Sequence, residues 1–243
     1  MTPCVQWCRY DLLDYESALL LQKELLESIL LHGDEGAAVT AGGMRRETAV
    51  RVILLEHPSV YTIGRSGHRR DVLCPGGHPP AIPVVETDRG GQVTYHGPGQ
   101  LVIYVIRDLR PHALASVRLH VHRLEEVVMQ TLADLGVTGR RDPCHPGVWV
   151  GDAKVAALGV RIHRGIAYHG IALNRDPDLR LFAGIIPCGL ADRPVTSLAR
   201  LGVSVARDVL EGRLLRILGR VFDVGRFMPP LPHMAGIGTG EGF

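Results

Sequence analysis

The chain has 243 residues, of which 46% are hydrophobic and 21% are charged, and its 27 Lys and Arg against 25 Asp and Glu give a net charge of +2. This apolar fraction excludes an intrinsically disordered protein, and the near-neutral charge argues against a dedicated nucleic-acid-binding protein. A chain of this length can bury about three quarters of its unfolded surface without disulfide bonds.

The cysteines argue against a secreted disulfide framework, because they are odd in number and have no repeated spacing. They are Cys4, Cys8, Cys74, Cys144 and Cys188. The N-terminal sequence lacks the basic and apolar regions of a signal peptide, and no apolar run approaches the roughly 20 residues of a membrane span. We therefore expect a cytoplasmic protein that does not enter a membrane.

The first part of the chain predicts a helix followed by short strands. Apolar residues recur every three to four positions over 15–32, which predicts an amphipathic helix. Residues 33–50 are rich in Gly and Ala and predict a loop, whereas the apolar run 51–57 predicts a strand that Pro58 ends. Residues 74–83 carry Pro and Gly in every register, which excludes regular structure.

The middle of the chain predicts two strands, 92–96 and 100–106, on either side of a Gly-Pro-Gly sequence. Ser116 and Gly136 bracket a stretch of helical periodicity, as N-terminal and C-terminal caps do.

The last part predicts β-structure over 148–173, with turns at Gly151-Asp152 and Arg164-Gly165, and a final helix over 206–222. This order of elements indicates an α/β (α+β) fold, in which a mixed β-sheet has flanking helices. We expect one domain over 1–227 and a flexible Pro/Gly-rich tail over 228–243.

The segment 88–100 is a candidate binding loop. Its paired glycines, Gly90 and Gly91, precede a strand that ends at His96. Glycine lets a ligand approach the backbone closely and leaves amide groups available. The alternative interpretation is an ordinary hairpin with a Gly-Pro-Gly turn.

Lys154 and Cys188 are the candidate reactive residues. Lys154 begins an otherwise apolar run, and its position alone favours an exposed lysine at a strand end. A desolvated amine at this position could instead accept a proton. Cys188 lies between Pro187 and Gly189, and it is either a small buried hydrophobe or a nucleophile on a loop.

The remaining polar patterns carry weaker signals. His169 and Asn174 border an apolar stretch, and each is more typical of a satisfied core group than of catalysis. The histidines and cysteines lack the spacing of a structural zinc site, and no GxxxxGK[ST] loop supports nucleotide hydrolysis. We expect no metal site.

Taken together, these segments resemble the lipoyl(octanoyl) transferase family, the octanoyltransferases of lipoate biosynthesis. The resemblance runs over residues 9–225 and rests on the matching segments 55–58, 61–65, 89–100, 147–149, 154–159, 169–174, 187–189 and 195–198. The long loop 33–50 and Pro177 depart from the family pattern, which bears on loop shape and partner contacts rather than on the reaction.

The resemblance implies an acyltransferase domain with the fold of the biotin/lipoate protein ligase catalytic domain. It implies transfer of an octanoyl group from octanoyl-acyl carrier protein to a lysine of lipoyl domains. Such domains occur in 2-oxoacid dehydrogenase E2 subunits and in the glycine cleavage H protein. It also implies no cofactor and favours a monomer.

The resemblance further assigns site residues. Cys188 corresponds to the nucleophile that accepts the acyl group, and Lys154 to the lysine that lowers the pKa of that thiol. The substrate contacts correspond to Arg89, Gly90, Gly91, Gln92, Val93, Thr94, Tyr95, His96, Ala157, Leu158, Gly159, Gly170, Ile171 and Ala172, with His169 and Asn174 as supporting residues.

Three alternatives remain open at this point. An ATP-dependent lipoate or biotin protein ligase would share the fold without needing Cys188. A non-catalytic module would bind lipoyl domains without turnover, and a thiol hydrolase would pass the acyl group to water. Whatever the reaction, we expect Arg65, Arg69, Arg70 and Arg89 to form a docking face for an acidic carrier protein.

Overall fold

The computed structural model describes residues 4–32, 49–73, 82–110, 117–186 and 193–228, and the strands in this part of the chain form two sheets. The large sheet has the strand order β11-β1-β2-β6-β10-β9-β8-β7 and the small one β4-β3-β5. The strands are β1 (Cys4–Leu12), β2 (Val50–Glu56), β3 (Val60–Ile63), β4 (Val84–Glu86), β5 (Val93–His96), β6 (Gln100–Asp108), β7 (Arg140–Arg141), β8 (Gly147–Val150), β9 (Ala153–His163), β10 (Ile166–Asn174) and β11 (Arg226–Phe227).

Both sheets are mixed. In the large sheet, β1 runs parallel to its two neighbours, β2 and β11. Every other pair of neighbouring strands in the order β2-β6-β10-β9-β8-β7 is antiparallel. In the small sheet, β3 is parallel to β4 and antiparallel to β5. The expected mixed α/β fold is therefore confirmed.

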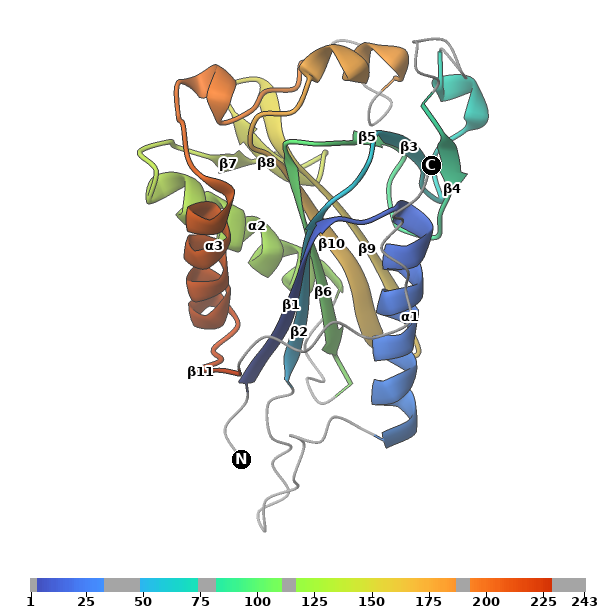
Figure 1. Ribbon diagram of the computed structural model, residues 1–243, viewed down its shortest axis with the longest axis vertical. Coiled ribbons are helices and arrows are strands. Elements are labelled where there is room, and N and C mark those ends of the chain that lie inside the picture. The colour runs from blue at the N-terminus through green and yellow to red at the C-terminus, as the bar shows by residue number, and fades with distance from the viewer. Residues whose placement is uncertain (1–3, 33–48, 74–81, 111–116, 187–192, 229–243) are drawn as a thin grey trace.

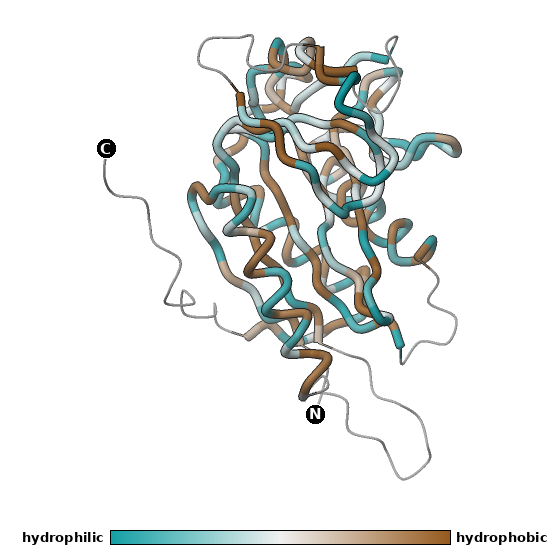
Figure 2. Tube along the Cα trace, turned by 90° about the vertical axis from the view of Figure 1, so that its right-hand side faces the viewer, coloured by the Kyte–Doolittle hydropathy of each residue, from teal (hydrophilic) through white to brown (hydrophobic). Residues whose placement is uncertain are grey.

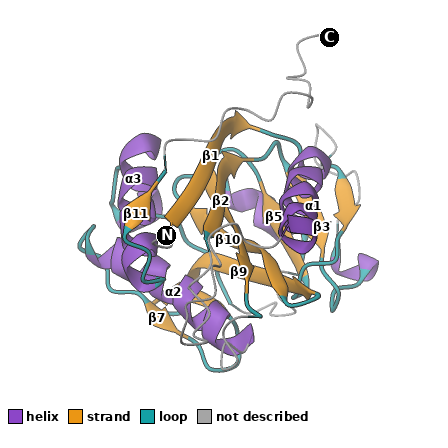
Figure 3. Cartoon of the chain, turned by 90° about the horizontal axis from the view of Figure 1, so that it is seen from below, coloured by secondary structure: helices purple, strands orange, loops and turns teal. Residues whose placement is uncertain are grey.

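Helices cover both faces of the large sheet, with α1 (Tyr15–His32) on one face and α2 (Val117–Ala133) and α3 (Arg207–Val221) on the other (Figures 1 and 3). On β6, alternate side chains enter the two cores: Leu101 and Ile103 pack with the core under α2 and α3, and Tyr104 with the core under α1. Because both faces are covered, every residue of β6 is buried, as in a strand at the centre of a three-layer domain.

The helix α1 follows directly from its sequence. Its buried residues, which include Ala18, Leu21, Leu26 and Ile29, repeat at the helical spacing and face the sheet. The side chain of Asp14 accepts a 2.8 Å hydrogen bond from the backbone N–H of Ser17, so the helix begins where an N-terminal cap is available. Figure 2 shows the same alternation of apolar and polar residues along the helices.

The small sheet lies at one end of the large sheet (Figure 1) and has a core of its own. There the rings of Tyr61 and Phe182 pack edge-on against Tyr95. Short 3-10 helices complete this region and the approach to α3: η1 (Arg69–Asp71), η2 (Leu179–Gly184) and η4 (Ala199–Leu201). The backbone N–H of Gly90 donates to the carbonyl of Val160 over 3.1 Å, which ties the loop before β5 to β9.

Most predicted elements agree with the structure. The predicted helices correspond to α1, α2 and α3, and the predicted turns separate β8, β9 and β10. The hairpin interpretation of residues 92–106 is wrong, because β5 and β6 belong to different sheets. The sequence reading missed β1, which pairs with β2.

Some expectations fall outside the described residues. These concern the Ser116 cap, nearly all of the loop 33–50 and the tail beyond Met228. Met228 itself is bound to β1, since its N–H donates to the carbonyl of Val5 and its own carbonyl accepts from the indole of Trp7. No helix in the described part of the chain has the length and apolar character to cross a bilayer.

Candidate active site

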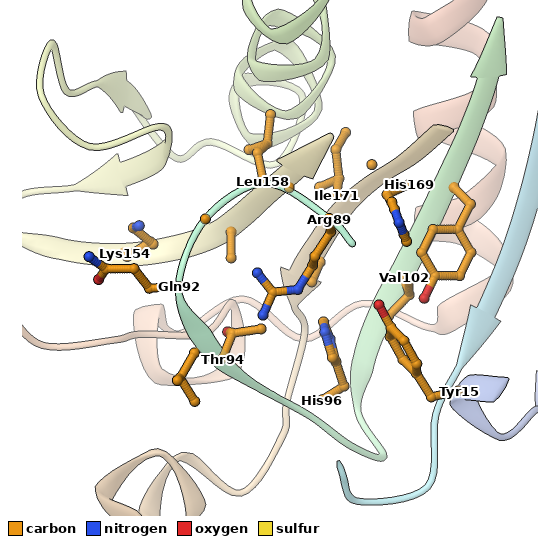
Figure 4. A pocket seen from close by; sticks show the side chains of 17 residues that line it. Tyr15, Arg89, Gln92, Thr94, His96, Val102, Lys154, Leu158, His169 and Ile171 are labelled. Carbon is orange, nitrogen blue, oxygen red and sulfur yellow. The ribbon is translucent and has the colours of Figure 1, made fainter. Parts of the chain in front are cut away.

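A cavity of about 520 Å³ lies where the small sheet meets β9 and β10 (Figure 4). Most of the residues that the sequence assigned to the substrate line it. They are Arg89, Gly91, Gln92, Val93, Thr94, His96, Ala157, Leu158, Gly159, Gly170, Ile171 and Ala172, together with Lys154 and His169. The structure thus brings together residues from positions 89 to 172 of the chain around one hollow.

Three assigned residues lie elsewhere. The side chain of Tyr95 packs in the small-sheet core, because the alternation along β5 turns it away from Thr94 and His96. Asn174 joins β10 to the following segment: its amide N–H donates to the carbonyl of Thr196 over 2.9 Å. Gly90 lines a neighbouring cavity instead. Cys188 lies outside the described residues.

The loop that carries Arg89 is held rigidly. The guanidinium of Arg89 is buried and donates to both the hydroxyl and the carbonyl oxygen of Thr62 over 2.8 Å. A Cβ atom at Gly64 would lie 2.4 Å from the carbonyl oxygen of Gly91, so the close approach of the two loops requires glycine there. Because Arg89 is buried, it does not belong to the exposed docking face that we expected it to share with Arg65, Arg69 and Arg70.

Lys154 lies at one end of the cavity with only 7% of its surface exposed. The expectation of an ordinary exposed lysine is therefore wrong. Its Nζ donates to the carbonyl of Pro146 over 3.2 Å and lies 4.9 Å from the centre of the Trp149 ring. The carbonyl and the indole hold the amine at the cavity end, where it faces the substrate residues.

The segment that follows Cys188 in the chain runs beside Lys154. The backbone N–H of Lys154 donates to the carbonyl of Pro194, and the N–H of Thr196 donates back to the carbonyl of Lys154, each over 2.9 Å. Arg193 forms a 2.6 Å ion pair with Asp142, and this interaction holds the pKa of Asp142 at about 2. The start of this segment is thereby fixed next to the buried lysine.

Two buried histidines, His96 and His169, line the cavity, and the ring of His57 lies against that of His96 with the centroids 5.7 Å apart. The ring of His57 lies between the carbonyl of Leu13, 2.6 Å from Nδ1, and the hydroxyl of Tyr104, 2.7 Å from Nε2. A carbonyl can only accept, so Nδ1 carries the proton and Nε2 accepts from Tyr104. Burial lowers the pKa of His57 to about 4 and that of His96 well below its ordinary value.

The protonated nitrogen of His96 can be assigned in the same way. The amide N–H of Gln100 donates to the carbonyl of Tyr95 and to Oδ1 of Asn174, so its oxygen is the group that lies 2.7 Å from Nδ1 of His96. Nδ1 is then the donor, and Nε2 keeps its lone pair. The wall therefore offers a hydrogen-bond acceptor rather than a positive charge at His96.

His169 adopts an unusual backbone conformation on β10, with φ at +63°. Such a conformation costs on the order of 1–3 kcal/mol for a residue with a side chain, and it persists only where the surroundings impose it. Here the N–H of His169 donates to the side-chain oxygen of Gln22 over 2.8 Å, and its Nε2 lies 2.9 Å from Oδ1 of Asp88. The hydrogen bond from His169 lowers the pKa of Asp88 to about 2.

A second cavity adjoins the first. The two share Gly91, Gln92, Lys154, Leu158 and Gly159, and the second is also lined by Cys144 and His145. Lys154 consequently lies at the junction of two hollows.

The sequence reading missed Tyr15, Val102 and Tyr104, which also line the first cavity. The sequence places Tyr15 at the start of the predicted helix 15–32 and Tyr104 within the predicted strand 100–106. The phenol hydroxyl of each tyrosine is the feature that could have indicated them, because a buried tyrosine needs a hydrogen-bond partner. Tyr15 finds one in the hydroxyl of Thr87 at 3.0 Å, and Tyr104 in His57.

Metal-binding residues are not grouped in the described ranges, where no three His, Cys, Asp or Glu side chains could hold an ion. The described cysteines Cys4, Cys8 and Cys144 are free thiols. Burial raises the pKa of Cys8 to about 11, so this thiol does not supply a thiolate near neutral pH.

Comparison with known proteins identifies the family. Residues 14–218 match the family model of the lipoyl protein ligase A/B catalytic domain. The octanoyltransferase of Magnetococcus marinus is 57% identical over 181 residues, which cover 74% of this chain and 81% of that protein. The chain belongs to the octanoyltransferase family. It is therefore an acyltransferase. The octanoyltransferase of Acidiphilium cryptum is a second similar protein; it is 44% identical over 91% of this chain and 94% of its own length.

Solved structures support the fold of this family member. Lipoate-protein ligase A bound with ATP superposes with a TM-score of 0.69 at 15% identity, over 96% of this chain and 90% of that one. A bi-partite lipoate protein ligase from Thermoplasma acidophilum gives a TM-score of 0.70 at 14% identity, over 96% and 88%. At this identity the likeness establishes the fold alone.

Proposed function

We propose that the chain transfers an octanoyl group from octanoyl-acyl carrier protein to the ε-amine of a lysine on lipoyl domains. The acceptors are those of 2-oxoacid dehydrogenase E2 subunits and the glycine cleavage H protein. Cys188 carries the acyl group between the two proteins as a thioester, and Lys154 accepts and returns the protons of each step. The observation that carries this proposal is the buried amine of Lys154 at the end of a largely apolar cavity.

The position of Lys154 relative to the chain supports its pairing with Cys188. Pro194 is hydrogen bonded to Lys154, and it lies only six positions after Cys188 in the sequence. A chain of six residues spans at most about 20 Å, a reach compatible with the proposed pairing of the thiol with the amine. On the other side, the N–H of Ile186 donates to the carbonyl of Asp71 over 2.8 Å, which fixes the second end of the segment.

The cavity suits a straight acyl chain. Its wall along β9 and β10 presents Ala157, Leu158, Ile171 and Ala172. Burial of the seven methylene and methyl carbons of an octanoyl group contributes about 5 kcal/mol, at about 0.8 kcal/mol for each carbon.

The reaction then balances without an added reagent. Cys188 gives its proton to Lys154, and the thiolate attacks the thioester carbonyl of the donor. The donor carbon–sulfur bond breaks, and the released carrier thiolate takes the proton from Lys154. In the second half, the neutral amine of the acceptor lysine attacks the Cys188 thioester, Lys154 accepts the amine proton, and the amide forms as the Cys188 thiolate leaves and is reprotonated.

Intact-protein mass spectrometry after incubation with octanoyl-acyl carrier protein, without ATP, tests this proposal. We expect one octanoyl adduct, absent in Cys188→Ser and discharged as octanoyl-lysine when a lipoyl domain is added. Cys144→Ser is the matched control, because Cys144 lines a cavity with Lys154 and is exposed; it should acylate normally.

The same experiment separates the alternatives. Transfer that needs ATP and free octanoate would indicate a ligase, and free octanoate as the product would indicate a hydrolase. Tight binding of a lipoyl domain without any turnover would indicate a binding module. An adduct that survives Cys188→Ser would overturn the assignment of the nucleophile.

A further inference from the structure

One carboxylate joins the loop between β7 and β8 to the segment that follows Cys188. Oδ1 of Asp142 accepts hydrogen bonds from the backbone N–H groups of Cys144 and His145, each over 3.0 Å. Its Oδ2 accepts from the guanidinium of Arg193 over 2.6 Å. Arg193 begins the described segment that follows Cys188, so the side chain of Asp142 connects two parts of the chain that are far apart in sequence.

The loop that Asp142 folds supplies groups that fix Nζ of Lys154. The carbonyl of Pro146 accepts a hydrogen bond from Nζ over 3.2 Å. The carbonyl of His145 accepts from the indole of Trp149 over 3.2 Å, and the centre of the Trp149 ring lies 4.9 Å from Nζ. A displacement of this loop therefore disturbs these two contacts of the amine.

Arg193 contacts the same ring from its own segment. The central carbon of its guanidinium lies 5.1 Å from the centre of the Trp149 ring. The next residue, Pro194, accepts a hydrogen bond from the backbone N–H of Lys154. Arg193 lies five positions after Cys188 in the sequence. Its ion pair therefore fixes the chain a short distance from the proposed nucleophile.

The positions of Asp142 and Arg193 indicate a supporting role. Neither residue lines the two cavities next to Lys154, so their effect on the reaction passes through other residues. An isolated surface ion pair contributes little, but this carboxylate also accepts from two backbone N–H groups and shapes the loop. Arg140 lies 3.7 Å from Oδ2 of Asp142, so a cation remains beside the carboxylate when Arg193 is replaced.

We propose that Asp142 and Arg193 are positioning residues of the transfer reaction: their ion pair holds the loop that fixes Lys154 and the segment that follows Cys188 in one relative position. The inference rests on the function proposed above, in which a proton passes between Cys188 and Lys154. Such a transfer needs the two groups within hydrogen-bond reach, about 2.6–3.2 Å between heavy atoms. A misplacement of about 1 Å can cost about 100-fold in rate, so a contact between the two supporting segments controls the rate without touching the substrate.

Alkylation of Cys188 as a function of pH, followed by peptide mass spectrometry, tests this role. A nearby positive charge lowers the pKa of a thiol, so the pKa of Cys188 reports how closely Lys154 lies. In Arg193→Met and in Asp142→Asn we expect this pKa to rise by about 1 and the octanoyl transfer rate to fall by about tenfold or more. Asp142→Asn keeps an oxygen for the N–H groups of the loop and removes the charge. Arg193→Lys keeps a cation and should restore most of the rate.

Two comparisons make the test specific to the ion pair. The double variant Asp142→Asn/Arg193→Met should be no slower than the slower single variant, because each change removes the same interaction. Arg216→Met is the matched control, since Arg216 on α3 forms a 2.7 Å ion pair with Asp134 and lines neither cavity. It should keep the wild-type rate and thiol pKa, and all folded variants should bind free octanoate as the wild type does.

Three outcomes would overturn the assignment. The first is a wild-type rate and thiol pKa in folded Asp142→Asn and Arg193→Met. The second is a double variant whose loss of rate is the product of the two single losses, which would mean that the residues act separately. The third is an equal loss in Arg216→Met, which would show that removing an ion pair anywhere in the protein has the same effect.

The variant Lys154→Met separates this inference from the proposed reaction. It should raise the pKa of the Cys188 thiol at least as much as the ion-pair variants do. If it does not, and the wild-type protein forms no octanoyl adduct, the proposed function fails and the inference fails with it. If Lys154→Met raises the thiol pKa while Asp142→Asn and Arg193→Met do not, the role of the ion pair fails and the proposed function stands.

Discussion

Gly147 on β8 lies directly against the side chain of Lys154 on β9. A Cβ atom added at Gly147 would lie 3.2 Å from Cε of Lys154 and 2.7 Å from the carbonyl oxygen of Ala156. The backbone at Gly147 also has φ at +138°, a conformation that only glycine adopts readily. The glycine thus provides the space in which the buried amine is held.

Replacing this glycine should affect both stability and activity. Gly147→Ala combines backbone strain with a clash against a strand carbonyl, and we expect the free energy of unfolding to fall by about 2–3 kcal/mol. The octanoyl transfer rate should fall at least tenfold, because Lys154 is displaced. Denaturant unfolding and single-turnover transfer measure the two effects. In the matched control Gly151→Ala, φ is +56° but no atom lies within 4 Å, so transfer should persist; wild-type transfer in Gly147→Ala would contradict this account.

The proton-transfer role of Lys154 makes a second prediction. Lys154→Arg retains a basic hydrogen-bond donor, but the guanidinium stays protonated and cannot accept the proton that the mechanism gives to Lys154. We expect transfer to fall by about 10²–10⁴-fold, the usual contribution of a positioned acid–base group. Circular dichroism and octanoate binding should stay close to the wild type. Lys154→Met, which removes this donor as well, should be equally slow; a rapid Lys154→Arg enzyme would exclude the base role.

The exposed arginines predict where the donor protein docks. Arg65, Arg69 and Arg70 are exposed around η1, and the carrier protein is expected to be acidic. The double reversal Arg69→Glu/Arg70→Glu should raise the KM for the carrier about tenfold at low ionic strength and less at high salt, with kcat unchanged. Arg216→Glu/Arg220→Glu, on α3, makes the same change in net charge and should leave KM unaltered. Equal effects of the two double variants would show that only net charge matters.

The parts of the fold that local patterns determine could be predicted from the sequence. The periodicity of α1 and the turn at Arg164-Gly165, where both residues have positive φ, are properties of short segments. The path from β5 to β6 depends on a distant residue instead. The N–H of Gly99 donates to the carboxylate of Glu56 over 2.7 Å, and this contact, 43 residues away in the sequence, helps to place β6 in the large sheet.

The candidate site divides in the same way. Motifs identified Lys154, Arg89 and most of the lining, because these residues lie in contiguous signature segments. Tyr104 could not be found from its surroundings, since its function as a partner of His57 appears only when β6 pairs with β2, which His57 follows. The burial of Arg89 in the loop before β5 was likewise hidden, because its partner Thr62 lies on β3, 27 residues away in the sequence.

The lowered pKa of buried His57 implies that the free energy of unfolding depends on pH. Its pKa is lowered to about 4 in the folded protein, against about 6.5 in the unfolded chain, because burial disfavours the charged ring. As pH falls below about 6.5, the unfolded state binds a proton that the folded state does not, so this group removes stability until about pH 4. The full difference corresponds to about 3 kcal/mol at about 1.4 kcal/mol per pKa unit.

The variant His57→Gln isolates this contribution. A glutamine can donate to the carbonyl of Leu13 and accept from Tyr104 as the neutral ring does, but it does not titrate. Denaturant unfolding between pH 7 and pH 4 should therefore show a shallower loss of stability in the variant, by up to about 3 kcal/mol. The other buried histidines titrate in both proteins and largely cancel in the comparison. Parallel pH profiles for the two proteins would mean that His57 does not remain neutral on acidification, and the hydrogen bond that it accepts from Tyr104 would then have to break in the folded state.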